Sequence, residues 1–312
     1  MNDKKLHIVF GSGPLGLAVV DELVKAGKPV RVVNRSGKAN IPAGVEVIAA
    51  DANNSAQAAA ACEGAGIVYH CANVAYEKWT TLFPPLTKGI LAGARSAGAR
   101  LVYGDNLYAY GPETETMREN SPQKPVGGKP SMRAEMEALL LDAHRSGELE
   151  VTIAKGSDFY GPRVLVSQMG NRVFPNLLSG KAASVMGNPD LPHSYTYIRD
   201  FARVMVLIAE APEAAGQVWH VPGAETLTTR QFIERAAKIA GVEPKVSAMP
   251  KGMMNVLSVF IPILKELKEV MYQFEQPFIV DGSKVQETFG FTPTPLDEAI
   301  GETVKWYDKN PK

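Results

Sequence analysis

Cysteine is scarce in this sequence, with only Cys62 and Cys71 among 312 residues. Two cysteines can form at most one disulfide, which makes a disulfide framework unlikely, and they are too few for a cysteine zinc site. We therefore expect a protein of a reducing compartment, the cytoplasm.

An excess of charge of either sign is also missing. The chain has 33 basic and 33 acidic residues, and the basic residues are scattered along the sequence. A chain of this kind lacks the positive surface that attracts nucleic acid. No nucleic-acid partner is predicted.

Long hydrophobic runs are absent as well. The start, MNDKKLHIVF, passes from charged residues into a strand-like run without the apolar region of a signal peptide. The apolar stretch MMNVLSVFIPIL, residues 253–264, is too short to span a bilayer and contains Pro262. We expect a helix packed on the second domain and no membrane span, with a membrane-surface or substrate-covering helix as the alternative.

The first half of the chain alternates between short apolar runs and segments with helical spacing. LHIVF, PVRVVN, VEVIAA, GIVYHC, RLVYG and EVTIAK read as strands, with helices near 55–62, 80–97 and 130–145. Parallel strands need crossover helices, so this alternation predicts a doubly wound α/β fold. We expect a first domain over 1–160, its sheet completed by residues near 195–221, and a smaller second domain over 161–312.

The sequence GSGPLG, residues 11–16, follows the first predicted strand and opens the first predicted helix. In that setting a G-x-G-x-x-G pattern predicts a dinucleotide-binding turn rather than a plain glycine turn. Its first glycine permits the tight turn, its second lets the backbone approach a pyrophosphate, and its third lets the helix pack on the strand. The cofactor-binding residues predicted here are Gly11, Ser12, Gly13, Pro14, Leu15 and Gly16.

The end of the second predicted strand, VVNRSG, favours one cofactor over another. NAD enzymes of this architecture usually present an acidic residue there to the ribose hydroxyls, whereas this chain has Asn34, Arg35 and Ser36. Arg35 can pair with a 2′-phosphate, and Lys38 is close in sequence. NADP(H) is therefore predicted in preference to NAD(H), with a plain surface arginine as the alternative.

Further landmarks resemble the extended short-chain dehydrogenase/reductases, in particular their sugar-epimerase-like branch with its Rossmann fold. The resemblance rests on AADANN, YHCAN, LVYGDNLYAYGP, AKGSDFYGP and YTYIRDFAR, which occur in the order found in that family. It implies that Asp51 and Ala52 lie beside the adenine, that Cys71, Ala72 and Asn73 line the middle of the cofactor, and that residues 158–162 lie near the nicotinamide. It also implies a homodimer formed by the helices near 80–97 and 130–145.

The chain departs from that family at its catalytic positions. The usual members carry a Ser four residues before a Tyr-Gly pair and then Y-x-x-x-K, whereas this chain has Asn106, Lys129 and Arg133. KPSMRAEME, with Glu137 four residues after Arg133, resembles instead the isoflavone-reductase group, which is NADPH-dependent and uses Lys as the general acid/base. Asn106 can still donate a hydrogen bond to a carbonyl oxygen.

Lys129 can act as an acid/base only if its pKa is lowered from about 10.4. A position at a helix N-terminus, the like charge of Arg133 and an oxidised nicotinamide would each lower it. The alternative is that Lys129, Arg133 and Glu137 form a solvated helix face.

Tyr160 is the reserve acid, and Tyr110 is expected to pack structurally. The five histidines have no metal-ligand spacing, so no metal is predicted and each is expected to be a hydrogen-bonded scaffold residue. The apolar residues Met169, Phe174, Met253, Phe260 and Met271 could line a pocket in the second domain.

These observations favour an NADP(H)-dependent oxidoreductase that acts on a carbonyl or activated alkene of a small molecule. The residues expected to carry the chemistry are Lys129, Asn106, Arg133 and Tyr160. One alternative is a cofactor-binding sensor or regulatory protein that has lost its chemistry. Another is a sugar-nucleotide epimerase or dehydratase, which the missing Tyr makes the less favoured enzyme.

Overall fold

The computed structural model describes residues 5–250, 252–254, 258, 260 and 262–311. Contacts within the chain divide it into two compact units. Unit 1 contains residues 1–105, 131–155 and 201–219, and unit 2 contains 106–130, 156–200 and 220–312. The chain crosses between the units several times, whereas the sequence predicted a first domain over 1–160 with its sheet completed by residues near 195–221. Because 106–130 joins unit 2, unit 2 takes in slightly more than half of the chain and is not the smaller part.

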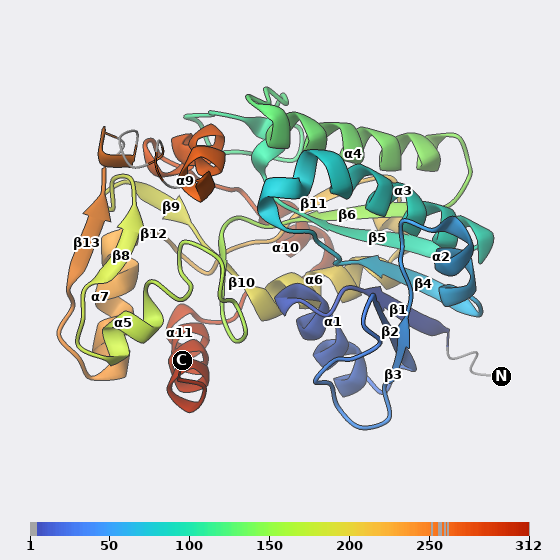
Figure 1. The fold of residues 1–312 in the computed structure, drawn as a ribbon, viewed down its shortest axis with the longest axis horizontal. Coiled ribbons are helices and arrows are strands. Elements are labelled where there is room, and N and C mark those ends of the chain that lie inside the picture. Colours follow the sequence, from blue (N-terminus) through green and yellow to red (C-terminus); the bar gives the residue numbers. More distant parts are fainter. Residues whose placement is uncertain (1–4, 251, 255–257, 259, 261, 312) are drawn as a thin grey trace. The chain divides into compact units, whose positions relative to one another are not determined.

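A seven-stranded sheet forms the centre of unit 1 (Figure 1). Its strand order is β11-β6-β5-β4-β1-β2-β3, and the pairings from β3 through β6 are all parallel. The order reverses between β1 and β4, where doubly wound folds bind their ligands. This confirms the predicted fold class. The strands are β1 (Leu6–Phe10), β2 (Val30–Asn34), β3 (Glu46–Ala49), β4 (Ala65–His70), β5 (Arg100–Asp105), β6 (Val151–Lys155) and β11 (Val218–His220).

Helices cover both faces of this sheet, as its apolar strands require. Every residue of β6 is buried, which is typical of a strand covered on two sides. Figure 1 shows α2, α3 and α4 over one face and α1 and α6 over the other. A Cβ on Gly104 of β5 would lie 2.7 Å from Leu15 of α1 and 3.2 Å from Met205 of α6, so the latter two helices share one face. The helices are α1 (Pro14–Lys25), α2 (Ser55–Ala61), α3 (Trp79–Ser96), α4 (Gly128–Arg145) and α6 (Ile198–Glu210), with short turns η1 (Tyr76–Lys78) and η3 (Pro212–Ala214).

Unit 2 is built from short strand pairs and helices around an aromatic core. Its core includes Tyr160, Phe174, Tyr195, Phe232 and Tyr307, all buried. Its helices and turns are η2 (Tyr108–Tyr110), α5 (Phe174–Leu178), α7 (Thr229–Ala240), α9 (Pro262–Leu267), η4 (Lys268–Phe274), α10 (Ser283–Phe289) and α11 (Leu296–Lys309). Its strands are β7 (Phe159–Tyr160), β8 (Ala183–Met186), β9 (Pro192–Ser194), β10 (Thr196–Tyr197), β12 (Thr226–Thr228) and β13 (Val246–Met249).

The boundaries of α7 show how local sequence sets these elements. The Thr228 hydroxyl accepts a hydrogen bond from the Gln231 backbone N–H, and the Thr228 backbone N–H donates to Gln231 Oε1. The two hydrogen bonds form a capping box. Gly241 ends the helix in the left-handed conformation that favours glycine.

The apolar stretch 253–264 lies partly outside the described residues. Within the described part, Met254 is buried, Met253 is 51% exposed and α9 begins at Pro262. No helix of the described residues is long and apolar enough to cross a bilayer.

Alanine substitutions at two helical glycines should change the stability of the protein in opposite directions. A Cβ on Gly89 of α3 would lie 1.6 Å from the Ala52 carbonyl oxygen, whereas a Cβ on Gly301 of α11 would meet only Ile239, at 3.9 Å. We expect Gly89→Ala to destabilise the protein by about 1–3 kcal/mol, because backbone would have to move. Gly301→Ala should stabilise it by about 0.5–1 kcal/mol, because glycine is the poorer helix former. Denaturant unfolding measures the free energy of unfolding of both variants. A loss of stability in Gly301→Ala would contradict the open space beside Gly301.

Candidate functional site

The glycine-rich turn after β1 lies against the end of β4. Gly11 has φ +102°, and a Cβ there would come within 2.7 Å of Ala72. A Cβ on Gly16 would lie 2.0 Å from the Gly11 carbonyl oxygen. Both positions therefore exclude any side chain, as a tight strand-to-helix turn at the switch point requires.

Gly13 differs from its two neighbours because nothing lies within 4 Å of the place where its Cβ would be. It precedes α1 in extended conformation, and Pro14 is the first helical residue. The first N–H groups of a helix have no partner within it and attract an anion. Open space in front of a helix N-terminus fits the pyrophosphate of a dinucleotide.

Asn34, at the end of β2, organises the loop that follows it. Its Nδ2 donates to Ser12 Oγ and to the Lys38 carbonyl oxygen, both at 2.9 Å. Its Oδ1 accepts from the Ser36 and Gly37 backbone N–H groups, at 3.0 and 2.8 Å. The amide is fully used in these bonds, so it shapes the loop after β2.

Arg35 and Lys38 are exposed on this loop. The Arg35 guanidinium makes no hydrogen bond or ion pair with any residue that the structure describes. Ser36 is exposed too, and its hydroxyl donates to Asn34 Oδ1 at 3.0 Å. No acidic residue stands at the end of β2, and two cations face solvent beside it.

The other predicted cofactor residues lie at the ends of β3 and β4. Asp51 Oδ1 accepts from the Asn53 backbone and side chain, at 3.0 and 2.9 Å, and Ala52 is buried. Burial raises the pKa of the Cys71 thiol well above its ordinary value, which favours the protonated form. Asn73 is exposed.

Arg133, predicted as a catalytic residue, is buried in an ion pair inside unit 1. Its Nη1 lies 3.1 Å from Asp105 Oδ1 and donates to the Tyr103 hydroxyl at 2.7 Å. Its guanidinium carbon lies 4.1 Å from the Trp79 ring centre and 3.9 Å from that of Phe83. The neighbouring aromatic faces and the carboxylate together stabilise a cation that is only 4% exposed.

Glu137 is buried one turn further along α4. It forms an ion pair with Lys155 of β6 at 2.5 Å, and the Lys155 side chain is fully buried. The alternative of a solvated charged face is therefore wrong for this helix, because the charges face inward and each meets an opposite charge.

Lys129 is the second residue of α4 and lies within unit 2. Its ammonium is 2.5 Å from Glu266 Oε2 and 2.7 Å from Glu269 Oε1, and its backbone N–H donates to Glu269 Oε2 at 3.3 Å. Burial alone lowers the pKa of Lys129, but the hydrogen bonds and charges of the two glutamates outweigh burial and raise it. The expected lowering of the pKa is wrong, because the sequence did not reveal the two carboxylates.

Asn106 and Tyr160 take structural positions in unit 2. Asn106 Oδ1 accepts the Tyr108 backbone N–H at 3.1 Å and so forms the turn after β5. Tyr160 packs in the aromatic core, 2% exposed, with its ring 4.9 Å from that of Phe232. Burial raises the pKa of its phenol, so it is a weak acid beyond the reach of solvent. Tyr110 packs structurally as predicted, with its hydroxyl 2.8 Å from His220 Nε2.

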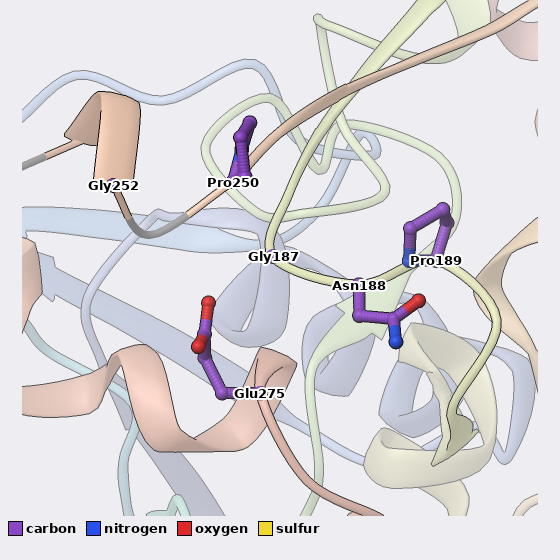
Figure 2. Close-up of a pocket in the computed structure, with 6 residues that line it drawn as sticks. All are labelled: Gly187, Asn188, Pro189, Pro250, Gly252 and Glu275. Carbon is purple, nitrogen blue, oxygen red and sulfur yellow. The ribbon is translucent and has the colours of Figure 1, made fainter.

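A hollow in unit 2 has a volume of about 470 Å³. Figure 2 shows the residues that line it. None of the predicted site residues lines it. Met169 and Phe174, expected to line a pocket, are instead fully buried in the core, and Phe260 is 78% exposed. The hollow is lined by Gly187, Asn188, Pro189, Pro250, Gly252 and Glu275.

Sequence reasoning missed the partners of the charged residues on α4. Asp105 directly precedes Asn106, but its carboxylate gave no sign that it would be buried. Glu266 and Glu269 lie in KELKE, directly after the apolar stretch 253–264, and no pattern in the sequence linked them to Lys129. Within the described residues, no cluster of three or more metal-ligating side chains is present.

The chain is similar in sequence and in fold to several known proteins. The chain is 23% identical to a dTDP-glucose 4,6-dehydratase of Streptomyces griseus, over 74% of this chain and 63% of that one, so it spans less than two thirds of that relative. It is 23% identical to the mouse sterol-4-alpha-carboxylate 3-dehydrogenase, decarboxylating, over 97% and 90% of the two chains. A dTDP-glucose 4,6-dehydratase of Streptomyces venezuelae, solved with NAD bound, superposes with a TM-score of 0.78 at 20% identity, covering 98% of this chain and 97% of that one.

The likeness to solved structures confirms the fold, and the family model adds the assignment. It matches residues 8–221, from the first strand of the sheet to just beyond its last. Because more than half of the chain is matched, the protein belongs to the NAD dependent epimerase/dehydratase family.

Proposed function

We propose that the protein is an NADP(H)-dependent oxidoreductase that acts on a carbonyl or activated alkene of a small organic molecule. The observation that carries the proposal is the loop after β2, where Asn34 holds the backbone and Arg35 is exposed without a partner among the described residues. An arginine guanidinium pairs well with a phosphate group. Asn34 is uncharged and stands at the position where an acidic residue would repel that phosphate.

The residues of unit 1 fit a dinucleotide. Gly11 and Gly16 exclude side chains from the turn, and Gly13 leaves space before the α1 N-terminus for a pyrophosphate. A bound nicotinamide exchanges a hydride with the substrate. The protein must then orient the substrate, stabilise charge on its oxygen and move one proton.

Lys129 is better suited to stabilising charge on the substrate oxygen than to moving a proton. Glu266 and Glu269 hold it in the charged form, so it gives up a proton less readily than a free lysine. In the proposed enzyme Lys129 acts as a fixed cation that stabilises negative charge on the substrate oxygen. The proton then comes from another group.

Two alternatives keep specific support. A cofactor sensor is favoured because both predicted proton donors make structural contacts: Lys129 is ion-paired, and Tyr160 lies in the core of unit 2. A sugar-nucleotide epimerase or dehydratase is favoured by the relatives, several of which act on such substrates by name. Following NADPH oxidation with carbonyl compounds, enones and sugar nucleotides separates the three, because a sensor consumes none of them.

Replacing Arg35 by Asp tests the cofactor. We expect the affinity for NADPH to fall about 10–100-fold, as loss of a charge-assisted hydrogen bond implies, while the affinity for NADH changes much less. Titration calorimetry with both cofactors measures this. Arg172→Asp, at an exposed arginine of unit 2, is the matched control and should leave both affinities unchanged. Equal losses for the two cofactors in Arg35→Asp would rule out phosphate pairing.

Two substitutions at Lys129 separate a fixed cation from a proton donor. Lys129→Met should lower kcat about 100-fold or more, because the charge on the substrate oxygen loses its counter-charge. Lys129→Arg keeps a permanent charge that can pair with both glutamates, so we expect it to retain most of the turnover. Steady-state kinetics with the best substrate of the panel decide this. Loss of turnover in Lys129→Arg as large as in Lys129→Met would return Lys129 to the role of proton donor.

The raised pKa of Lys129 also predicts how stability depends on pH. A raised pKa means that the ion pairs contribute stability below the unfolded pKa of about 10.4 and lose it as the pH rises through the folded pKa. The Tm difference between the wild type and Lys129→Met should therefore be full at pH values below 10 and shrink above it. A difference that stays constant across this range would show that the charge on Lys129 does not stabilise the fold.

A further inference from the structure

A second hollow of unit 2 lies along α11, and we call it the α11 hollow. Its volume is about 320 Å³, which is within the range of sites that hold small molecules. α11 contributes Glu302, Lys305, Trp306 and Lys309 to its lining. These four residues have the spacing i, i+3, i+4 and i+7, so they share one face of the helix. None of the predicted cofactor or catalytic residues lines this hollow.

The opposite wall of the α11 hollow comes from the chain that follows two parallel strands. β7 pairs with β10 residue for residue, so the segments that leave these strands start side by side. Pro162 and Arg199 each stand two residues beyond the end of their strand, and both line the hollow. The Tyr307 hydroxyl of α11 donates to the Val164 carbonyl oxygen, which fixes the helix against the segment that leaves β7.

The lining of the α11 hollow carries more positive than negative charge. Its basic residues are Arg199, Lys305 and Lys309. The Oε2 atom of Glu302 lies 3.3 Å from Arg199 Nε and accepts a hydrogen bond from the Tyr197 hydroxyl. Glu302 therefore offsets the charge of Arg199 and leaves the charges of the two lysines. Neither lysine has a hydrogen-bond or ion-pair partner within the part of the chain that the structure describes.

Lys305 and Lys309 stand one helical turn apart, and both are exposed. Like charges at this spacing repel each other and destabilise a helix. The dipole of α11 favours a cation in its last turn, where Lys309 stands, but it does not explain why two lysines border a hollow. A phosphate group between them would remove the repulsion and accept charge-assisted hydrogen bonds from both.

Trp306 adds an aromatic ring and a hydrogen-bond donor to the same hollow. The indole N–H of Trp79 donates to the Val74 carbonyl oxygen at 3.1 Å, and that of Trp219 donates to the Ala214 carbonyl oxygen at 3.2 Å. The indole N–H of Trp306 has no acceptor among the described residues, although the ring is partly buried against the core of unit 2. A tryptophan that leaves water generally gives its N–H a partner. The third indole of the chain is thus open to a ligand.

We propose that the α11 hollow binds a small phosphate monoester that carries an aromatic ring. Lys305 and Lys309 pair with the phosphate oxygens, and the ring of the ligand stacks on Trp306, as nucleic-acid bases stack on aromatic side chains. Pro162 adds apolar surface to the hollow. The site lies within unit 2 and shares no residue with the glycine turn after β1, so it does not rest on the proposed oxidoreductase function.

Titration of the whole chain with three compounds tests the class of ligand. Phenyl phosphate has both groups, inorganic phosphate has no ring, and phenol has no phosphate. Calorimetry should give a Kd for phenyl phosphate at least about 10-fold lower than for either of the others, because only phenyl phosphate makes both contacts. Phosphate that binds as tightly as phenyl phosphate, or phenyl phosphate that does not bind, would overturn the proposal.

Nitrogen NMR of the protein labelled at tryptophan locates the ligand. The three tryptophans give three indole signals, and the loss of one in Trp306→Phe identifies that of Trp306. Phenyl phosphate should shift the Trp306 signal and leave those of Trp79 and Trp219, which belong to unit 1, in place. Binding that leaves the Trp306 signal unmoved would show that phenyl phosphate occupies another site and would overturn the proposal.

The two lysines are tested together, because either one alone can still hold a phosphate. The double variant Lys305→Gln with Lys309→Gln should bind phenyl phosphate about 10–100-fold more weakly, as loss of charge-assisted hydrogen bonds implies. Both side chains are exposed, so the fold does not depend on them. Lys238→Gln, at an exposed lysine in the last turn of α7, is the matched control and should keep the wild-type affinity. Wild-type affinity in the double variant would overturn the proposal.

Discussion

The charges on the inward face of α4 are the constraint on which much of this structure depends. Lys129, Arg133 and Glu137 follow one another at four-residue intervals, and all are at most 5% exposed. A buried charge without a partner costs several kcal/mol, so each must meet an opposite charge. Lys129 pairs with Glu266 and Glu269. Arg133 pairs with Asp105, and Glu137 pairs with Lys155. Residues far apart in the sequence are thereby fixed by the composition of one helix.

This constraint bears on the chemistry at the position where related enzymes carry a tyrosine. A lysine there could work as a base only in a setting that disfavours its charge. The two glutamates do the opposite and favour the charged form, because they raise the pKa of Lys129. Arg133 likewise is held by Asp105 and two aromatic rings rather than left available to a ligand. The face of α4 thus supplies fixed charge, and in the proposed enzyme the proton comes from another group.

Local features of the sequence were enough to predict the sheet and the tight glycine turn after β1. The glycines at 11 and 16 are required by backbone contacts within a few residues of the turn or at the adjacent strand, and such requirements are visible as a pattern. The doubly wound order followed from the alternation of apolar strands and helices.

The arrangement around Lys129 could not be predicted because its determinants are distant in the sequence. Glu266 and Glu269 are separated from Lys129 by 137 and 140 residues. A four-residue charge spacing fits a buried face and a solvated face equally well, and only the tertiary partners decide between them. His193 illustrates the same limit, since nothing in the sequence near it shows that its ring nitrogens lie within hydrogen-bond distance of the Gln273 carbonyl oxygen and the Asp158 carboxylate.

In the proposed function, the uncharged Asn34 in the loop after β2 determines which cofactor the protein prefers. An acidic residue at that position would bind ribose hydroxyls and repel a phosphate. Asn34 gives up direct recognition, since its amide is spent on Ser12, Ser36, Gly37 and Lys38. In return the loop is ordered before any ligand arrives, with the Arg35 side chain outside that bonding network. Order in the backbone lowers the entropic cost of binding, so under the proposed function a single exposed arginine would be sufficient to recognise the phosphate.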